Sequence, residues 1–237
     1  MPPIIVGHRG VSGTHPENTN SSINRAIELG LRWVEIDVQP SKDGVLVVCH
    51  DHTIDRCSDG QGRVDAYTLQ QLKQFDFGTW FSPEFSCEPI LTLCELLDLA
   101  VKHDLNLNIE IKVDKHDSLK VVEQLKEQLD NSPIHRNNII LSSFNHEIMR
   151  QLCKYCPGYR LSVVTKKLTN QTRNLLAEVN AYGCHINYQW IRQQQINELK
   201  KGGYQVWCYT VNDAEKYSLL TEVDAIFTDY PERFISS

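Results

Sequence analysis

Short runs of apolar residues recur along the whole chain and alternate with amphipathic stretches. The runs are rich in Val, Ile and Leu and are bounded by turn residues or charged residues, which is typical of buried β-strands. Nine runs fit this pattern. They are Ile4–His8, Trp33–Val38, Val45–His50, Leu107–Lys112, Ile139–Phe144, Arg160–Val164, Cys184–Asn187, Val206–Thr210 and Ala225–Thr228.

The stretches between most of these strands carry signals for the start and end of helices. Thr68 and Thr92 are each followed three residues later by Gln or Glu, the spacing of a capping box. Asn212 is placed to cap a helix over Ala214–Leu220, and Gly202 follows a Lys-rich stretch where a helix would end. Strands and helices are therefore expected to alternate.

This alternation predicts an α/β fold, a TIM-type (β/α)8 barrel that takes residues 1–237 as one domain. Nine strands are one too many, and the connection from Val38 to Val45 is too short for a crossover helix. The two runs form either a hairpin or an extended loop that returns along the barrel. We favour the loop, because it brings His50 to the same rim as Asp37. Residues 51–90 are expected to form a small insertion after the third strand, over the barrel mouth.

Composition and charge reduce the number of plausible classes of function. Hydrophobic residues make up 41% and charged residues 23%, and the net charge is −6 without a basic stripe. This argues against a nucleic-acid partner, so local cations must bind any substrate phosphate. No apolar run approaches the roughly 18 residues of a membrane span, and no signal peptide is evident. With eight scattered cysteines, interpreted as reduced thiols, we expect a cytoplasmic protein without stable membrane insertion; the oligomeric state is left open.

Charged residues and histidines gather near the ends of the first four strands. They are His8, Arg9, Glu35, Asp37, His50, Glu110 and Lys112. Residues two apart on a strand share a face, so each Glu-x-Asp or Glu-x-Lys pair points the same way. Catalytic groups of a parallel barrel lie at the C-terminal strand ends, so we expect these side chains to point inward while the intervening isoleucines face the helices.

Three of these residues form a candidate metal site. Glu35, Asp37 and Glu110 would repel one another if they converged without a cation. Carboxylate oxygens suit one hard divalent cation, Mg²⁺ or Ca²⁺, with Mn²⁺ also possible. The alternative is that each acid forms only a salt bridge, for example with Arg9 or Lys112.

Two strand-end histidines suit general acid–base chemistry, because histidine exchanges protons near neutral pH. Of His8 and His50, one would take a proton from a nucleophile and the other would give one to a leaving oxygen. Arg9 and Lys112 are able to hold a phosphate through charge-assisted hydrogen bonds. We expect the other histidines to be surface or structural residues. These are His15, His52, His103, His116, His135, His146 and His185.

Ordered motifs make the chain resemble the bacterial-type, cytoplasmic glycerophosphodiester phosphodiesterases over nearly its whole length. The resembling blocks are Gly7-His8-Arg9-Gly10 with Pro16-Glu17-Asn18-Thr19, Val34–Val38 with Lys42-Asp43-Gly44 and His50-Asp51, Asn108–Lys112, Ser142-Ser143-Phe144, Thr210-Val211-Asn212 and Thr228-Asp229-Tyr230-Pro231. A single block would be weak evidence, whereas six in order are specific.

The resemblance implies a TIM-type barrel with an insertion, and it implies roles for individual residues. His8 and His50 would be the acid–base pair, and Arg9 and Lys112 would contact the phosphate. Glu35, Asp37 and Glu110 would bind the metal, while Phe144 and Trp207 would line the pocket. The family hydrolyses glycerophosphodiesters to sn-glycerol 3-phosphate and an alcohol.

Other functions remain possible on the same barrel. A lysophospholipase D or a phosphatidylinositol-type phospholipase would need an apolar rim, which Trp80, Phe81 and Phe85 in the insertion are able to supply. A catalytically silent binding protein would lack a metal ligand or a histidine, and this chain has them all. The nucleophile is left open between water and the adjacent glycerol hydroxyl, and so is the histidine that acts as the base.

Overall fold

Eight parallel strands close into a barrel in the computed structural model, which describes residues 2–235. In ring order the strands are β1 (Ile4–His8), β2 (Trp33–Pro40), β4 (Asn106–Ile111), β5 (Ile139–Ser143), β6 (Arg160–Thr165), β7 (Gly183–Asn187), β8 (Gln205–Tyr209) and β9 (Ala225–Thr228). The ring closes because β1 pairs with both β2 and β9. The predicted TIM-type barrel is confirmed, and the predicted strand ends differ from the observed ends by at most two residues.

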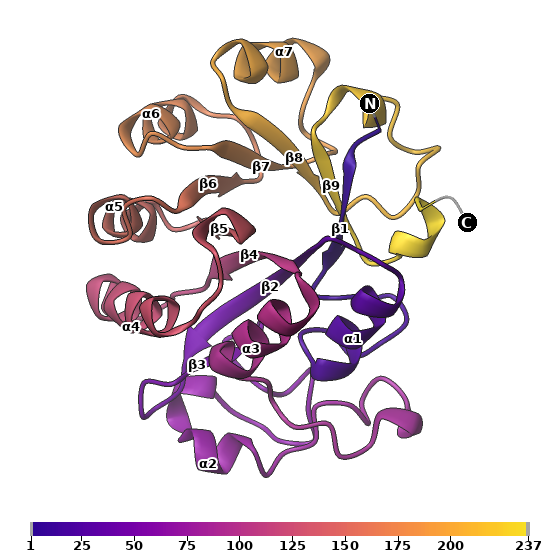
Figure 1. Ribbon diagram of the computed structural model, residues 1–237, viewed down its shortest axis with the longest axis vertical. Helices are drawn as coiled ribbons and strands as arrows, with labels where there is room; N and C mark the ends of the chain where they lie inside the picture. Colours follow the sequence, from indigo (N-terminus) through magenta and orange to yellow (C-terminus); the bar gives the residue numbers. More distant parts are fainter. Residues whose placement is uncertain (1, 236–237) are drawn as a thin grey trace.

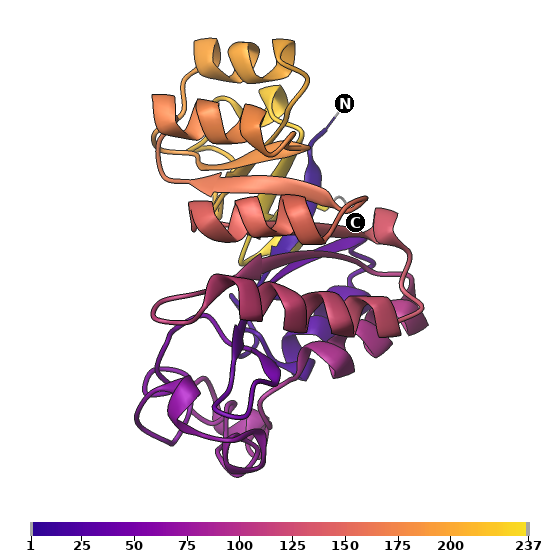
Figure 2. The same cartoon turned by 90° about the vertical axis from the view of Figure 1, so that its left-hand side faces the viewer.

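Helices surround the barrel and cover its outer face (Figure 1). They are α1 (Asn20–Glu28), α2 (Leu69–Leu72), α3 (Leu93–His103), α4 (Ser118–Asn131), α5 (His146–Tyr155), α6 (Asn170–Glu178) and α7 (Gln193–Lys201), with short 3-10 helices at Val64–Ala66, Pro83–Phe85, Arg136–Asn138, Leu220–Glu222 and Pro231–Arg233. Figure 2 shows helices α4 to α7 stacked along one side of the molecule. None of the helices within residues 2–235 is long and apolar enough to cross a membrane.

The extra strand forms a hairpin. β3 (Leu46–Val48) lies outside the ring and pairs antiparallel with the end of β2, where Val38 lies opposite Val48. The favoured extended loop is therefore wrong and the alternative hairpin is right. A turn at Ser41 closes it: the backbone N–H of Gly44 donates to the Ser41 carbonyl and that of Val45 to the Ser41 hydroxyl.

The segment after β3 packs around a small core of its own. This core contains Val47 of β3 and, from the segment itself, Cys49, Ile54, Val64, Leu72, Phe77 and Ile90. The expected capping boxes are present, at Thr68 before α2 and at Thr92 before α3. In Figures 1 and 2 this segment forms one end of the molecule, beside the hairpin.

One predicted helix is not formed. Between β8 and β9 the structure has turns and a single 3-10 helix at Leu220–Glu222, where we expected a helix over Ala214–Leu220. The side chain of Asn212, the expected cap, is engaged elsewhere. Its amide NH₂ donates to Asp229 (2.6 Å), and its carbonyl oxygen accepts from the hydroxyl of Thr228 (3.1 Å).

The barrel has two kinds of interior. Outward-facing Ile36 and Ile111 are buried against the helices, as expected. Below the pocket the interior is apolar and aromatic, with Trp33 and Trp207 in a cluster that extends to Phe227 at the pocket wall. Towards the C-terminal ends the inward side chains become polar and charged. The barrel interior is therefore polar at the C-terminal strand ends and apolar below them.

Candidate active site

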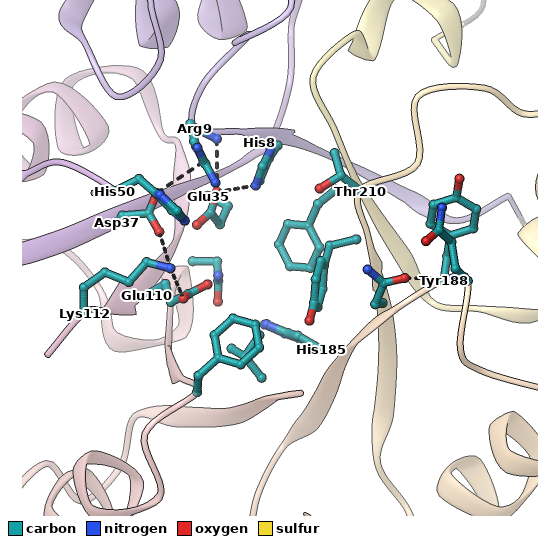
Figure 3. Close-up of a pocket in the computed structure, with 17 residues that line it drawn as sticks. His8, Arg9, Glu35, Asp37, His50, Glu110, Lys112, His185, Tyr188 and Thr210 are labelled. Atoms are coloured by element: carbon teal, nitrogen blue, oxygen red, sulfur yellow. Dashed lines mark hydrogen bonds and ion pairs between the residues drawn. The ribbon is translucent and has the colours of Figure 1, made fainter. Parts of the chain in front are cut away.

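A pocket of about 410 Å³ opens among the C-terminal ends of the strands (Figure 3). Its charged side is formed by His8, Arg9, Glu35, Asp37, His50, Glu110 and Lys112, and the rest of the wall by Asn108, Phe144, Val164, His185, Asn187, Tyr188, Gln189, Tyr209, Thr210 and Phe227. The structure thus brings every predicted site residue except Trp207 into one pocket. His50 reaches it from the end of the hairpin. Residues 51–90 contribute no side chain to this wall.

Three buried carboxylates form the centre of the charged side. Asp37 on β2 and Glu110 on β4 are partners in the strand register, and Glu35 shares the inward face of β2 with Asp37. One oxygen of each carboxylate lies within 4.8 Å of the others, and the three residues are between 1% and 8% exposed. The strand spacing therefore does place these groups where one cation would contact all of them.

These carboxylates differ in their electrostatic surroundings. Burial, reinforced by Asp37 and Glu110, raises the pKa of Glu35 well above its usual value. Burial also raises the pKa of Glu110, against the opposing effect of Lys112. Burial acts in the same direction on Asp37, but Lys112 and Arg9 outweigh it and hold its pKa well below its usual range. The protein cations thus compensate Asp37 most fully, and Glu35 least.

His8 is held from behind by an acidic residue that we did not predict. Its Nδ1 lies 2.6 Å from Oδ1 of Asp229, which follows β9, and its Nε2 lies 3.9 Å from Glu35. Asp229 also accepts hydrogen bonds from the hydroxyl of Ser12 (2.8 Å) and the amide of Asn212 (2.6 Å). Burial opposes ionisation of Asp229, but these contacts outweigh it and lower its pKa to about 2. His8 therefore has a fixed ring with Nε2 on the pocket side.

His50 has a similar support, reached through a chain of ion pairs. Its Nδ1 lies 2.6 Å from Asp51, which accepts from Nε of Arg56 at 2.7 Å. Arg56 forms two further hydrogen bonds with Glu17, and Glu17 accepts from Arg9 at 2.7 Å. Burial lowers the pKa of His50, so its neutral form is favoured. The chain connects one candidate catalytic histidine to a candidate phosphate ligand.

The turn after β1 sets the direction of Arg9. Arg9 and Gly10 both have positive φ, 53° and 83°. A Cβ on Gly10 would lie 2.4 Å from Oγ of Ser22, whose hydroxyl donates to the carbonyl of Arg9. The backbone N–H of Arg9 donates to Glu35 at 3.0 Å. Glycine is thus required for helix α1 to approach this turn.

Lys112 lies at the opposite edge of the carboxylate group. Its Nζ is 2.5 Å from Glu110 and 3.2 Å from Asp37, and it sits 5.6 Å from the ring centre of Phe144. Figure 3 shows Lys112 and Arg9 on either side of Asp37, both pointing into the pocket. Two cations therefore flank the three acids.

The remaining wall is uncharged and partly aromatic. Phe144 is 46% exposed and its ring meets Tyr209 edge-on. Trp207 does not line the pocket: it is 1% exposed, stacks on His185 and lies one inward position deeper on β8 than Tyr209. We expected His185 to be a surface or structural residue, yet it lines this wall.

The sequence contains partial signals for Asp51 and Asp229, the two acidic residues that we did not predict as part of the site. Asp51 and Asp229 each end or follow a strand on the rim where the candidate catalytic residues were expected, and both occur in the family-like blocks. Their pairing with His50 and His8 depends on side-chain direction, which spacing alone does not give.

Comparisons with known proteins agree on one family. The model of the glycerophosphoryl diester phosphodiesterase family matches residues 8–233. A glycerophosphodiester phosphodiesterase of Caldanaerobacter subterraneus subsp. tengcongensis is 34% identical over 241 residues, covering 100% of this chain and 98% of that protein. One of Bacillus altitudinis is 32% identical over 236 residues, covering 98% and 96%. A solved structure of an Oleispira antarctica phosphodiesterase in complex with the product sn-glycerol-3-phosphate is 31% identical with a TM-score of 0.94, covering 98% of this chain and 95% of that chain.

Proposed function

The chain belongs to the glycerophosphoryl diester phosphodiesterase family, and from this membership we propose that it hydrolyses glycerophosphodiesters to sn-glycerol 3-phosphate and an alcohol. The single observation that carries the proposal is the pocket itself. Three buried carboxylates, two histidines with their own carboxylate partners and the positively charged side chains of Arg9 and Lys112 converge in it. These groups can supply the acid–base catalysis and charge stabilisation that promote hydrolysis of a phosphodiester.

The acidic trio fits a hard divalent cation, Mg²⁺ or Ca²⁺, with Mn²⁺ as a further possibility. Glu35 and Glu110 have raised pKa values because they are buried and repel neighbouring acids, so a cation would stabilise their ionised forms. All three ligands are carboxylate oxygens, which such ions prefer. When bound, the cation would offset the charge that develops on the phosphoryl oxygens.

The protein groups divide the remaining work. Arg9 and Lys112 bind the phosphate and orient it between His8 and His50. One histidine removes a proton from the nucleophile, either water or the adjacent glycerol hydroxyl, and the other protonates the leaving alcohol. In each histidine Nδ1 faces a carboxylate, which leaves Nε2 for proton transfer. The glycerol route would pass through a cyclic phosphate.

The test is release of sn-glycerol 3-phosphate from glycerophosphocholine by the purified protein. We expect EDTA to stop the reaction and Mg²⁺ or Ca²⁺ to restore it. His8→Ala and His50→Ala should each lower kcat by at least 100-fold, whereas His146→Ala, a histidine outside the pocket, should not. Full turnover in His8→Ala would refute the acid–base roles. A search for cyclic glycerophosphate would separate the two routes, because only attack by the glycerol hydroxyl forms it.

The alternative lipid substrates require an apolar approach to the same pocket. In the insertion the ring of Phe81 meets Trp80 and Phe85 edge-on, with ring centres 5.7 and 5.8 Å apart, and none of the three lines the pocket. No contact of these rings favours a long-chain substrate. Turnover of lysophosphatidylcholine above that of glycerophosphocholine would nevertheless replace the proposed substrate.

A further inference from the structure

The pocket wall opposite the carboxylates carries neither an acid nor a permanent cation. It is formed by Phe144, Val164, His185, Asn187, Tyr188, Gln189, Tyr209, Thr210 and Phe227. In Figure 3 the imidazole of His185 projects from this wall across the pocket towards Glu110. A charged part of a ligand would find no opposite charge on this wall.

Two deeply buried polar side chains in the pocket lack partners. Asn108 is 1% exposed and His185 is 2% exposed, and both line the pocket. Within residues 2–235, Oδ1 of Asn108 and Nε2 of His185 have no hydrogen-bonding partner. A buried polar group without a hydrogen-bonding partner is unfavourable, because it has lost its contacts with water. The pocket wall therefore contains hydrogen-bonding capacity that residues 2–235 do not use themselves.

His185 is held rigidly and is neutral at physiological pH. Its ring stacks on Trp207 at 5.0 Å between ring centres and 15° between planes, and it meets Phe227 at the same distance. Burial lowers the pKa of His185 to about 3. A neutral imidazole offers one donor and one acceptor, and the amide of Asn108 offers both as well.

We propose that Asn108 and His185 form a hydroxyl-binding subsite that takes a neutral polyol part of the substrate. A hydroxyl group donates and accepts at once, which matches both side chains. Asn108 lies two residues before Glu110 on the same face of β4, so a bound polyol lies next to the groups that hold the phosphate. The inference rests on the proposed function, and the polyol is either the glycerol of the product or a polyol head group.

The first test measures binding, so it does not depend on turnover. Dissociation constants for sn-glycerol 3-phosphate and for inorganic phosphate are determined by titration calorimetry. We expect wild type to prefer sn-glycerol 3-phosphate, and His185→Phe to lower that preference about tenfold, the worth of roughly one hydrogen bond. Phenylalanine retains the stacking on Trp207. Asn108→Leu, a second variant of similar size, should have the same effect.

Ser162→Ala is the matched control. Its hydroxyl is also buried in the barrel interior and has no hydrogen-bonding partner among the described residues, but Ser162 does not line the pocket. We expect this variant to keep the wild-type preference. An unchanged preference in both His185→Phe and Asn108→Leu, or an equal loss in Ser162→Ala, would overturn the subsite.

The second test identifies the source of the hydroxyls. Glycerophosphocholine carries them on one side of the phosphate, and glycerophosphoglycerol carries them on both. A rise in KM of His185→Phe for both substrates assigns the subsite to the product glycerol, and a rise for the second alone assigns it to the head group. No rise for either substrate would overturn the proposal. Failure of the proposed function would be recognised separately, because wild type would then release no sn-glycerol 3-phosphate.

Discussion

Replacing Asp229 by asparagine tests how far activity depends on the carboxylate behind His8. In wild type the two side chains are 2.6 Å apart, and Ser12 and Asn212 hold Asp229 in place. Asparagine has nearly the same shape, but it lacks the charge and is able to turn an NH₂ group towards the ring. The imidazole would then lose its fixed tautomer and the stabilisation of its protonated form.

The expected loss follows from the strength of this contact. A hydrogen bond to a charged group contributes about 1.5–3 kcal/mol, and each 1.36 kcal/mol changes a rate tenfold. We therefore expect kcat of Asp229→Asn to fall about 10- to 150-fold. KM and the affinity for the divalent cation should change little, because Asp229 is outside the pocket wall and the acidic trio.

The assay is steady-state release of sn-glycerol 3-phosphate from glycerophosphocholine, with cation affinity measured by calorimetry and folding by thermal denaturation. Asp213→Asn is the matched control, since Asp213 is a half-exposed acid in the nearby β8–β9 connection that pairs with Lys216. An unchanged kcat in Asp229→Asn would refute the reasoning. So would an equal loss in the control, or a loss explained by unfolding.

Four further outcomes are expected. Glu35→Gln should weaken divalent-cation binding at least tenfold in calorimetry, yet raise the melting temperature of the EDTA-treated protein, because the buried carboxylate is disfavoured among like charges. Arg56→Ala should lower kcat several-fold without a large change in KM, since it breaks the ion-pair chain behind His50. Gly10→Ala should lower the free energy of unfolding in urea by about 2 kcal/mol or more, because a Cβ would meet Ser22 and φ is 83°. The free energy of unfolding should fall as pH drops from about 4 to about 2. The fold lowers the pKa of Asp229 from 3.8 to about 2, so ionised Asp229 stabilises the fold above pH 3.8 and this contribution is lost as the carboxylate is protonated. Asp229→Asn should show a smaller fall when denaturation is followed against pH.

The carboxylate trio was predictable because a strand has a fixed period. Residues two apart share a face, so Glu35 and Asp37 had to point the same way, and parallel register placed Glu110 beside them. Strand ends of a parallel barrel meet at one rim, which gave His8 and His50 as neighbours of the trio. These inferences need only backbone geometry.

Backbone geometry alone does not predict how deep a side chain lies in the barrel, or which of several competing partners it bonds to. Trp207 and Tyr209 share the inward face of β8, and sequence does not say which of them lies at the pocket and which lies below it. Asn212 was expected to cap a helix, but its amide group is bonded to Asp229 and Thr228 instead, which lie 17 and 16 positions away, beyond the reach of a local capping signal. Tertiary contacts decided both cases.

Assembly of this site requires β1 and β9, which lie near opposite ends of the chain, to pair. The His8–Asp229 pair joins residues 221 positions apart, and the adjoining strands pair along the same seam. Such contacts form slowly, because the loop-closure entropy must be overcome before the pairing stabilises anything. A fragment that ends before β9 also lacks Asp229, so its His8 would have no carboxylate partner. The barrel can be reconstituted from two separately expressed halves. Activity that appears only after the halves combine would show that proton transfer by His8 depends on the pairing of β1 with β9.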